Sequence, residues 1–356
     1  MEAISLIPFV KDVMLINLWW FFIVTGVMSW AFTGLLRHYA LAKSLIDIPN
    51  QRSSHSIPTP RGGGLAIVLT MLAILPVFAW LGWLPLGVTI GFGGAGGLVA
   101  LVGFLDDHGH VRARWRLLAH FLAAAWGLYW LGGFPTINVF GFYLNLGWFG
   151  NVLSAIYLVW LLNLYNFMDG IDGIASIEAI TVCFGGILMV WMVAPGEYVW
   201  SGSLLLLASV AGFLVWNYPP AKIFMGDAGS GFLGLMLGLL SIHAATANSK
   251  LFWGWMILLG AFIVDATVTL LRRLTNREKL YEAHRSHAYQ YASRKLGSHE
   301  KVTLAYGIIN LAWLLPLALC VAMGWLDGLV GVLISYTPLI IVAFYFKAGA
   351  RKLQEV

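Results

Sequence analysis

The chain consists almost entirely of apolar runs, each long enough to cross a membrane as a helix. A helix of about 20 apolar residues crosses a bilayer core about 30 Å thick. Eleven runs approach that length, at about 14–36, 62–81, 87–105, 116–132, 148–165, 175–194, 200–216, 230–246, 252–271, 303–323 and 329–346. Only 10% of the 356 residues are charged and 60% are hydrophobic, which excludes an ordinary soluble domain. We therefore predict an all-α polytopic membrane protein with about 11 transmembrane helices.

The distribution of basic residues orients these helices. Loops on the cytoplasmic side of a membrane carry an excess of Lys and Arg. Loops 37–61, 106–116, 217–229 and 272–302 and the tail from 347 together hold 19 of the 21 Lys and Arg residues. This asymmetry predicts a periplasmic N-terminus, a cytoplasmic C-terminus and a further cytoplasmic loop at 166–174. No soluble domain fits between the spans, so 1–356 is expected to be a single integral-membrane domain.

Five aspartates are expected at the cytoplasmic ends of spans: Asp106, Asp107, Asp169, Asp172 and Asp227. Charge at bilayer depth is costly and usually marks a functional pathway. At the interface the cost is smaller, and a lone Asp there is more often a solvated helix cap. Five acids on one face, several of them beside glycine, favour a functional site instead.

The first group lies in DDHGHVRARWR, residues 106–116. The adjacent carboxylates of Asp106 and Asp107 repel each other, so the pair needs a compensating cation. A hard divalent metal bound through oxygen would supply the positive charge. Arg112, Arg114 and Arg116 could neutralise the pair instead, and the sequence leaves both alternatives open.

The second group lies in NLYNFMDGIDGIA, residues 163–175, where Asn163, Asn166, Asp169 and Asp172 are three residues apart. On a continuous helix each step of three falls about 60° short of a full turn, so the first and last members would point in opposite directions. The glycines after the two aspartates allow the backbone to turn. We expect this turn to bring the late members back towards a common pocket.

The third group lies in AKIFMGDAGSGFLG, residues 221–234. Asp227 stands between glycines where a new span begins, and a glycine-rich helix N-terminus is a ready anion site. Lys222 adds a cation and Phe224 an aromatic face. A structural glycine turn explains this segment about as well when it is taken alone.

Two cytoplasmic loops and one span add further candidates. His284 and His287 lie one helical turn apart with Arg285 between them, and they fit phosphate contacts; a plain basic loop attracted to anionic lipid is the alternative. The segment HSIPTPRGGG, residues 55–64, places prolines before three glycines, where backbone or ligand can approach closely. Asp265 lies within a span about 10 Å from Arg272 along a helix, as a buried structural partner would.

Taken in order, PTPRGGG, the paired aspartates, NFMDGIDGIA, FMGDAGS and the histidine-bearing loop resemble the bacterial polyprenyl-phosphate N-acetylhexosamine-1-phosphate transferase family. The resemblance runs from about residue 47 to 302. It implies transfer of a sugar 1-phosphate from a UDP-sugar to undecaprenyl phosphate at the inner membrane, with Mg²⁺ or Mn²⁺ as cofactor. It also implies a homodimer. The string HRSH replaces the histidine runs of better-known branches, which favours an O-antigen or other surface-glycan initiating enzyme.

The resemblance also implies roles for single residues. Asp227 would be the metal ligand together with Asp107, and Asp106 the proposed base. Asn166, Asp169 and Asp172 would bind nucleotide or position the diphosphate, and Phe224 would stack on uracil. The remaining expected substrate contacts are His55, Arg61, Lys222, His284, Arg285 and His287.

A different class of function is a cation-coupled transporter that uses carboxylates at the membrane interface. Transporter sites usually lie near the bilayer midplane on broken helices, whereas these acids cluster at one face. A structural lipid-binding scaffold is a third alternative, and it leaves the carboxylate clusters unexplained. No nucleic-acid partner is expected.

Overall fold

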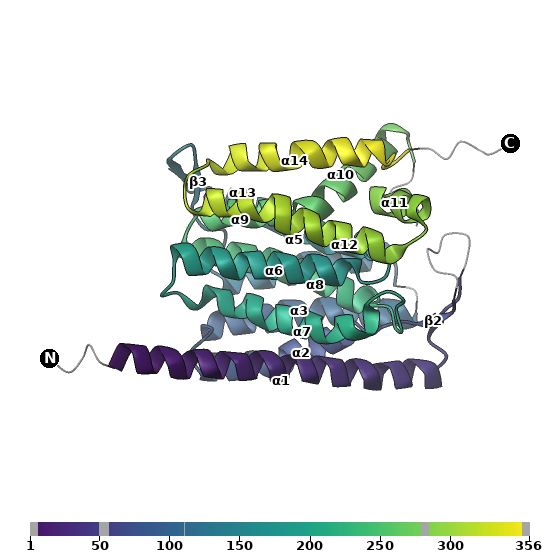
Figure 1. The fold of residues 1–356 in the computed structure, drawn as a ribbon, viewed down its shortest axis with the longest axis horizontal. Coiled ribbons are helices and arrows are strands. Elements are labelled where there is room, and N and C mark those ends of the chain that lie inside the picture. The colour runs from purple at the N-terminus through teal and green to yellow at the C-terminus, as the bar shows by residue number, and fades with distance from the viewer. Residues whose placement is uncertain (1–5, 50–56, 110, 279–284, 351–356) are drawn as a thin grey trace.

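The structure is a computed structural model that describes residues 6–49, 57–109, 111–278 and 285–350. It is a bundle of helices with two short hairpins (Figure 1). The helices are α1 (Leu6–Ala42), α2 (Leu65–Trp80), α3 (Leu86–His108), α4 (Ala113–Trp130), α5 (Gly147–Met168), α6 (Ile174–Val193), α7 (Ser201–Asn217), α8 (Asp227–Ala247), α9 (Lys250–Leu258), α10 (Gly260–Thr275), α11 (Ala288–Leu296), α12 (His299–Ile309), α13 (Leu315–Ala322) and α14 (Gly328–Tyr345). A 3₁₀ turn (Tyr198–Trp200) precedes α7, and a π turn (Asn310–Leu314) joins α12 to α13.

The predicted fold class, an all-α polytopic membrane protein, is confirmed. Within the described ranges, eight helices are long and apolar enough to cross a membrane, and a bent pair would make a ninth. The other two expected spans correspond to α2, an apolar helix of 16 residues, and to α4, which has Arg114 and Arg116 in its first turn. The total of eleven spans stays a prediction.

The expected single helix 252–271 is the one clear departure. It is broken into α9 and α10, which meet at an angle of 65°. Gly260 begins α10 against Tyr336, so closely that a Cβ atom would lie 2.8 Å from the ring. Beyond the bend, Asp265 and Thr269 of α10 are buried and hydrogen-bonded, as polar groups at membrane depth require.

Two acids lie inside the bundle. Asp265 does not pair with Arg272, whose guanidinium donates instead to the backbone carbonyl of Ala348 at 2.7 Å. Glu178 in α6 is fully buried, and the side-chain amide of Asn310 in the π turn donates to it at 2.7 Å. Buried charged or polar groups need such partners, and this hydrogen bond connects α6 to the π turn.

Helix α8 forms the centre of the bundle. Its most apolar stretch is completely buried, and it packs chiefly against α3 and α5. Gly231, Gly234 and Gly238 of α8 allow this packing; for example, a Cβ atom on Gly238 would lie 2.6 Å from the side chain of Leu158. The N-terminal end of α8 is therefore held rigidly where α3 and α5 end.

The hairpins lie at opposite ends of the bundle. Strands β1 (Ile46–Asp47) and β2 (Thr59–Pro60) pair antiparallel at the end that carries α11, and β3 (Ile137–Val139) pairs with β4 (Phe142–Leu144) at the other end (Figure 1). Helix α1 starts at the β3 end and α14 finishes at the α11 end. This placement agrees with termini on opposite sides; which side is cytoplasmic stays a prediction.

Candidate functional site

Asp107 closes the N-terminal end of α8. Its side chain is only 7% exposed, and its two oxygens accept long hydrogen bonds, both of 3.4 Å, from the backbone N–H groups of Asp227 and Ala228. These N–H groups have no partner within the helix, and the helix dipole favours a carboxylate beside them. Arg61 holds the end of α3, since its guanidinium donates to the carbonyl of Asp107 at 2.6 Å. Asp107 is therefore positioned as a cap supplied by a different helix.

Glycines allow these segments to approach each other. A Cβ atom on Gly103 of α3 would lie 2.6 Å from the backbone of Ala228, and one on Gly64 would lie 2.6 Å from the Cα of Gly229. The N–H of Gly64 donates to the carbonyl of Met225 at 2.8 Å. Gly64 of PTPRGGG and Gly229 of FMGDAGS are thus explained by backbone packing between the two segments.

Arg116 of α4 lies between two carboxylates. It forms an ion pair with Asp106 and stands 3.7 Å from the carboxylate of Asp227. The second oxygen of Asp106 accepts the backbone N–H of Val111 at 2.8 Å. One of the two sequence interpretations of the paired acids is therefore realised: an arginine from the same loop supplies compensating charge.

A cavity of about 200 Å³, here called the α4 cavity, lies between α3, α4, α5 and α8. Its polar lining is Asp106, Arg116, His120, Asn163, Asn166 and Asp227. Apolar side chains of α3, α4 and α5 form the rest of the wall. The amide oxygen of Asn166 accepts the hydroxyl of Ser230 at 3.2 Å, which ties α5 to the first turn of α8.

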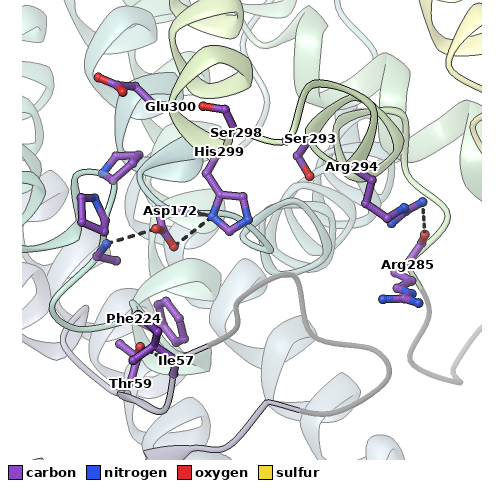
Figure 2. Close-up of a pocket in the computed structure, with 14 residues that line it drawn as sticks. Ile57, Thr59, Asp172, Phe224, Arg285, Ser293, Arg294, Ser298, His299 and Glu300 are labelled. Carbon is purple, nitrogen blue, oxygen red and sulfur yellow. Dashed lines mark hydrogen bonds and ion pairs between the residues drawn. The ribbon is translucent and has the colours of Figure 1, made fainter.

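A second and larger cavity of about 570 Å³, here called the Phe224 pocket, lies at the same end of the bundle (Figure 2). Phe224, Ile57 and Thr59 lie on one side of it, and Ser298 and Glu300 on the other. Its polar lining is Thr59, Asp172, Arg285, Ser293, Arg294, Ser298, His299 and Glu300. The pocket thus combines an aromatic face with two arginines.

Backbone pairing holds Phe224 in place. Its N–H donates to the carbonyl of Pro60 at 2.8 Å, and its carbonyl accepts the N–H of Gly63 at 2.9 Å. The rigid proline segment before α2 therefore positions the aromatic residue that the sequence identified in a different loop.

Asp172 is held by two separate elements, α12 and the 219–224 segment. One oxygen lies 3.3 Å from Nδ1 of His299, and the other accepts the N–H of Ala221 at 3.1 Å (Figure 2). The backbone carbonyl of Asp172 accepts the hydroxyl of Thr303 at 2.8 Å. Asp172 thus connects the 219–224 segment to α12 within the wall of the Phe224 pocket.

The expectation that the three-residue series would converge on one pocket is wrong. Asn163 and Asn166 line the α4 cavity, whereas Asp172 lines the Phe224 pocket. Helix α5 ends at Met168, and Gly173 adopts a φ of 73° before α6 begins. The turn therefore carries the late members of the series away from the early ones.

Asp169 lies at this turn, in a region crowded with negative charge. Burial raises the pKa of Asp169 well above its usual range, and the carboxylates of Asp227, Asp172 and Asp107 raise it further. Like charges this close oppose ionisation of the last member. The region would therefore gain from a positive ligand.

The donor atoms at this end fit a hard divalent cation. Carboxylate oxygens are the ligands that Mg²⁺ prefers, and a cation would relieve the repulsion around Asp169. Within the described part of the chain, however, no three Asp, Glu, His or Cys side chains stand close enough together to enclose a metal ion. The chemistry fits, and enclosure would require the carboxylates to move together.

The predicted histidines fall in different places. His55 and His284 lie outside the described residues. His287 is 3% exposed, with Nδ1 3.4 Å from the carboxylate of Asp265, and it does not line the Phe224 pocket. The structure therefore places His287 beneath the pocket wall, and its expected contact with diphosphate stays a prediction.

Lys222 and Arg285, two cations predicted to contact substrate, also lie in different places. The ammonium of Lys222 lies 5.7 Å from the ring centre of Trp216, outside the pocket lining. Arg285 lines the pocket, and its carbonyl accepts a hydrogen bond from Arg294 at 3.3 Å.

His120, Arg294 and His299 line these cavities and were not among the candidates. His120 stands one helical turn after Arg116 on α4, and that spacing could have revealed it. His299 follows the Gly-Ser that separates α11 from α12, without a local signal for its pairing with Asp172.

Sequence comparisons relate the chain to known proteins. The sequence model of glycosyl transferase family 4 matches residues 89–245. The chain is 31% identical to the phospho-N-acetylmuramoyl-pentapeptide-transferase of Geobacillus kaustophilus, over 70% of this chain and 80% of the relative. It is 28% identical to the probable undecaprenyl-phosphate N-acetylglucosaminyl 1-phosphate transferase of Bacillus subtilis, over 75% of each chain. It is also 28% identical to the undecaprenyl-phosphate alpha-N-acetylglucosaminyl 1-phosphate transferase of Thermotoga maritima, over 76% of this chain and 81% of the relative.

Proposed function

The chain belongs to glycosyl transferase family 4, and on this premise we propose that it transfers an N-acetylhexosamine 1-phosphate from a UDP-sugar to undecaprenyl phosphate. The observation that carries the proposal is a pair of unlike cavities beside one group of carboxylates. Asp172 lines the Phe224 pocket, and Asp106 and Asp227 line the α4 cavity. A water-soluble donor and a membrane-bound acceptor need two such compartments.

The Phe224 pocket suits the donor. An aromatic face can stack on a nucleobase, and the arginines Arg285 and Arg294 can bind the oxygens of a diphosphate with paired N–H groups. The pocket is also large enough for part of a nucleotide, since ligand sites commonly have volumes of about 300–1,000 Å³.

The α4 cavity suits the acceptor phosphate. Its apolar walls belong to helices of the membrane bundle, and Arg116 offers a guanidinium at the level of the carboxylates. A polyprenyl chain could remain in lipid while its phosphate reaches this cavity.

In the proposed reaction an oxygen of the acceptor phosphate forms a bond to the β-phosphorus of the donor. The bond from that phosphorus to the bridging oxygen breaks, and its electron pair leaves with UMP. The product is undecaprenyl-diphosphate-sugar. Two anions must meet, so the dominant requirement on the protein is to offset their repulsion.

Mg²⁺, or Mn²⁺, would supply that offset as a Lewis acid, held by Asp227 with Asp107. Asp106 is paired with Arg116, which makes it a weak proton acceptor. A phosphate monoester has a second pKa of about 6 and is mostly deprotonated at neutral pH. We therefore propose that Asp106 contributes only modestly as a general base. Positioning of the metal by Asp227 should matter more.

The excess of Lys and Arg in one set of loops supports a cytoplasmic site at a bacterial inner membrane. The HRSH string supports an enzyme that begins O-antigen or a related surface glycan. The transporter alternative has no support from the relatives, and the carboxylates gather at one end of the helices.

The test is transfer of radiolabel to undecaprenyl phosphate by purified protein in detergent. A panel of UDP-N-acetylhexosamines is supplied, with Mg²⁺ present or chelated. We expect magnesium-dependent lipid labelling and UMP release, both lost in Asp227→Asn. Asp327→Asn is the matched control, because Asp327 caps α14 near the β3–β4 hairpin and Asn is also a good cap. Passage of labelled cations across proteoliposomes without transfer would contradict the proposal.

A further inference from the structure

Asp265 is the centre of a buried cluster outside the two cavities. It lies on α10 and is 3% exposed. Its oxygens accept the backbone N–H groups of Ala288 at 2.9 Å and Tyr289 at 3.0 Å. These are the first two N–H groups of α11, so a carboxylate from another helix caps α11.

Side chains from neighbouring elements complete the cluster. The hydroxyl of Tyr306 on α12 donates to Asp265 at 2.9 Å, and that of Thr269 donates at 3.2 Å. Nδ1 of His287 lies 3.4 Å from the same carboxylate. One buried side chain therefore joins α10, α11 and α12.

Helix α11 reaches the carboxylate-bearing turn from this anchored end. The hydroxyl of Tyr289 donates to the carbonyl of Phe167 at 3.0 Å. Gly170 lies so close to this hydroxyl that any Cβ atom there would collide with it. The start of α11 is thus set against the turn that carries Asp169 and Asp172.

The other end of α11 faces the Phe224 pocket, where Ser293 and Arg294 form part of the lining. Burial of a carboxylate is costly unless every oxygen is well partnered, and here the partners lie on the elements that build the pocket. A simple cap would require only the α11 contacts, whereas this cluster also includes α12, which carries His299.

We propose that Asp265 is a positioning residue for donor binding: it fixes α11 so that Arg294 and the 169–173 turn face the same ligand. This inference rests on the proposed function for the identity of the ligand. Asp265 itself lies beneath the pocket wall and does not line the pocket.

Two variants test the proposal, Asp265→Asn and the milder Tyr306→Phe, which removes one hydrogen bond. Tyr336→Phe is the matched control. It deletes the hydroxyl of a tyrosine that donates to the carbonyl of Met256 at 2.7 Å, away from α11. Asp265→Glu serves as the conservative rescue.

The first measurement is hydrogen exchange of the α11 amides in detergent. We expect the α11 amides to exchange faster than in wild type in Asp265→Asn and, to a lesser degree, in Tyr306→Phe. In Tyr336→Phe we expect their exchange rates to be unchanged. The second is UMP affinity by calorimetry, together with KM for each substrate. We expect UMP affinity to fall about tenfold in Asp265→Asn and about threefold in Tyr306→Phe, donor KM to rise in parallel, acceptor KM to stay constant, and Asp265→Glu to recover part of the loss.

Unchanged α11 exchange in the Tyr306→Phe variant, or an equal loss of UMP affinity in Tyr336→Phe, would overturn the positioning role. If Asp265→Asn does not fold, the Tyr306→Phe comparison alone decides. Failure of the wild-type protein to bind UMP or transfer sugar phosphate would overturn the proposed function, while the exchange data would still decide whether Asp265 fixes α11.

Discussion

The close approach of α3 to α8 can be tested with one methyl group. In Gly103→Ala the new Cβ atom would lie 2.6 Å from the backbone of Ala228, about 0.8 Å short of the 3.4 Å at which ordinary contacts begin. The obstacle is backbone, so it cannot rotate away, and α3 must shift. We expect the end of α3 that carries Asp107 to move off the first turn of α8.

Gly97→Ala is the matched control on the same helix, because its Cβ atom would meet nothing within 4 Å. Both substitutions gain about 1 kcal/mol of helix propensity, and this gain cancels in the comparison. Overpacking in a well-packed core costs about 1–3 kcal/mol. The free energy of unfolding of Gly103→Ala should therefore be about 1–3 kcal/mol below that of Gly97→Ala.

The assays are SDS-induced unfolding in mixed micelles and transfer of radiolabel to undecaprenyl phosphate. A misplacement of about 1 Å can cost about 100-fold in rate, so we expect kcat of Gly103→Ala to fall about 10- to 100-fold, with Gly97→Ala near wild type. Equal unfolding free energies and equal kcat in the two variants would refute the claim that backbone contact at Gly103 sets the carboxylate geometry.

Other outcomes follow from the described contacts. Because the pKa of Asp169 is raised in the folded protein, its ionisation opposes folding; the advantage in melting temperature of Asp169→Asn over wild type should grow as the pH rises from about 4 and level off above the raised pKa. Thermal unfolding with a chelator present checks this, and a constant advantage would contradict it. Arg294→Ala should raise donor KM about tenfold, whereas Lys295→Ala should not, since the ammonium of Lys295 lies 4.8 Å from the ring centre of Tyr345; steady-state kinetics of both variants decide. Lys222→Met should leave donor KM unchanged and lower the free energy of unfolding by at most about 1 kcal/mol, the loss of one cation–π contact.

The helical architecture was predictable because each span is a continuous apolar run, which is a local feature of the sequence. Apolar runs locate most of the helices to within a few residues, although α1 spans Leu6–Ala42 and not 14–36, and α8 begins at Asp227 and not near residue 230. The earlier start depends on Asp107, which caps the helix from a different span. A cap supplied 120 residues away leaves no local pattern in the sequence.

The same limit explains what was missed in the site. The pairing of Asp172 with His299 joins positions 127 residues apart, and the burial of His287 depends on Asp265 in an earlier helix. By contrast, Phe224 and Arg285 were identified from the short motifs FMGDAGS and HRSH, which place an aromatic residue near Asp227 and an arginine between two histidines. Short motifs thus located several of the polar groups, and tertiary contacts decided which of them meet.

The central position of α8 has a consequence for the order in which the protein is made. Its main packing partners, α3 and α5, both precede it in the chain. When α8 emerges during synthesis, the surfaces that receive its glycines are already present in the membrane. We expect Asp107 and Asp227 to be brought together at that moment, while Arg294 and His299 are still unmade. The acidic half of the site would then be assembled first, and the half that carries Arg294 and His299 would close over it at the end of translation.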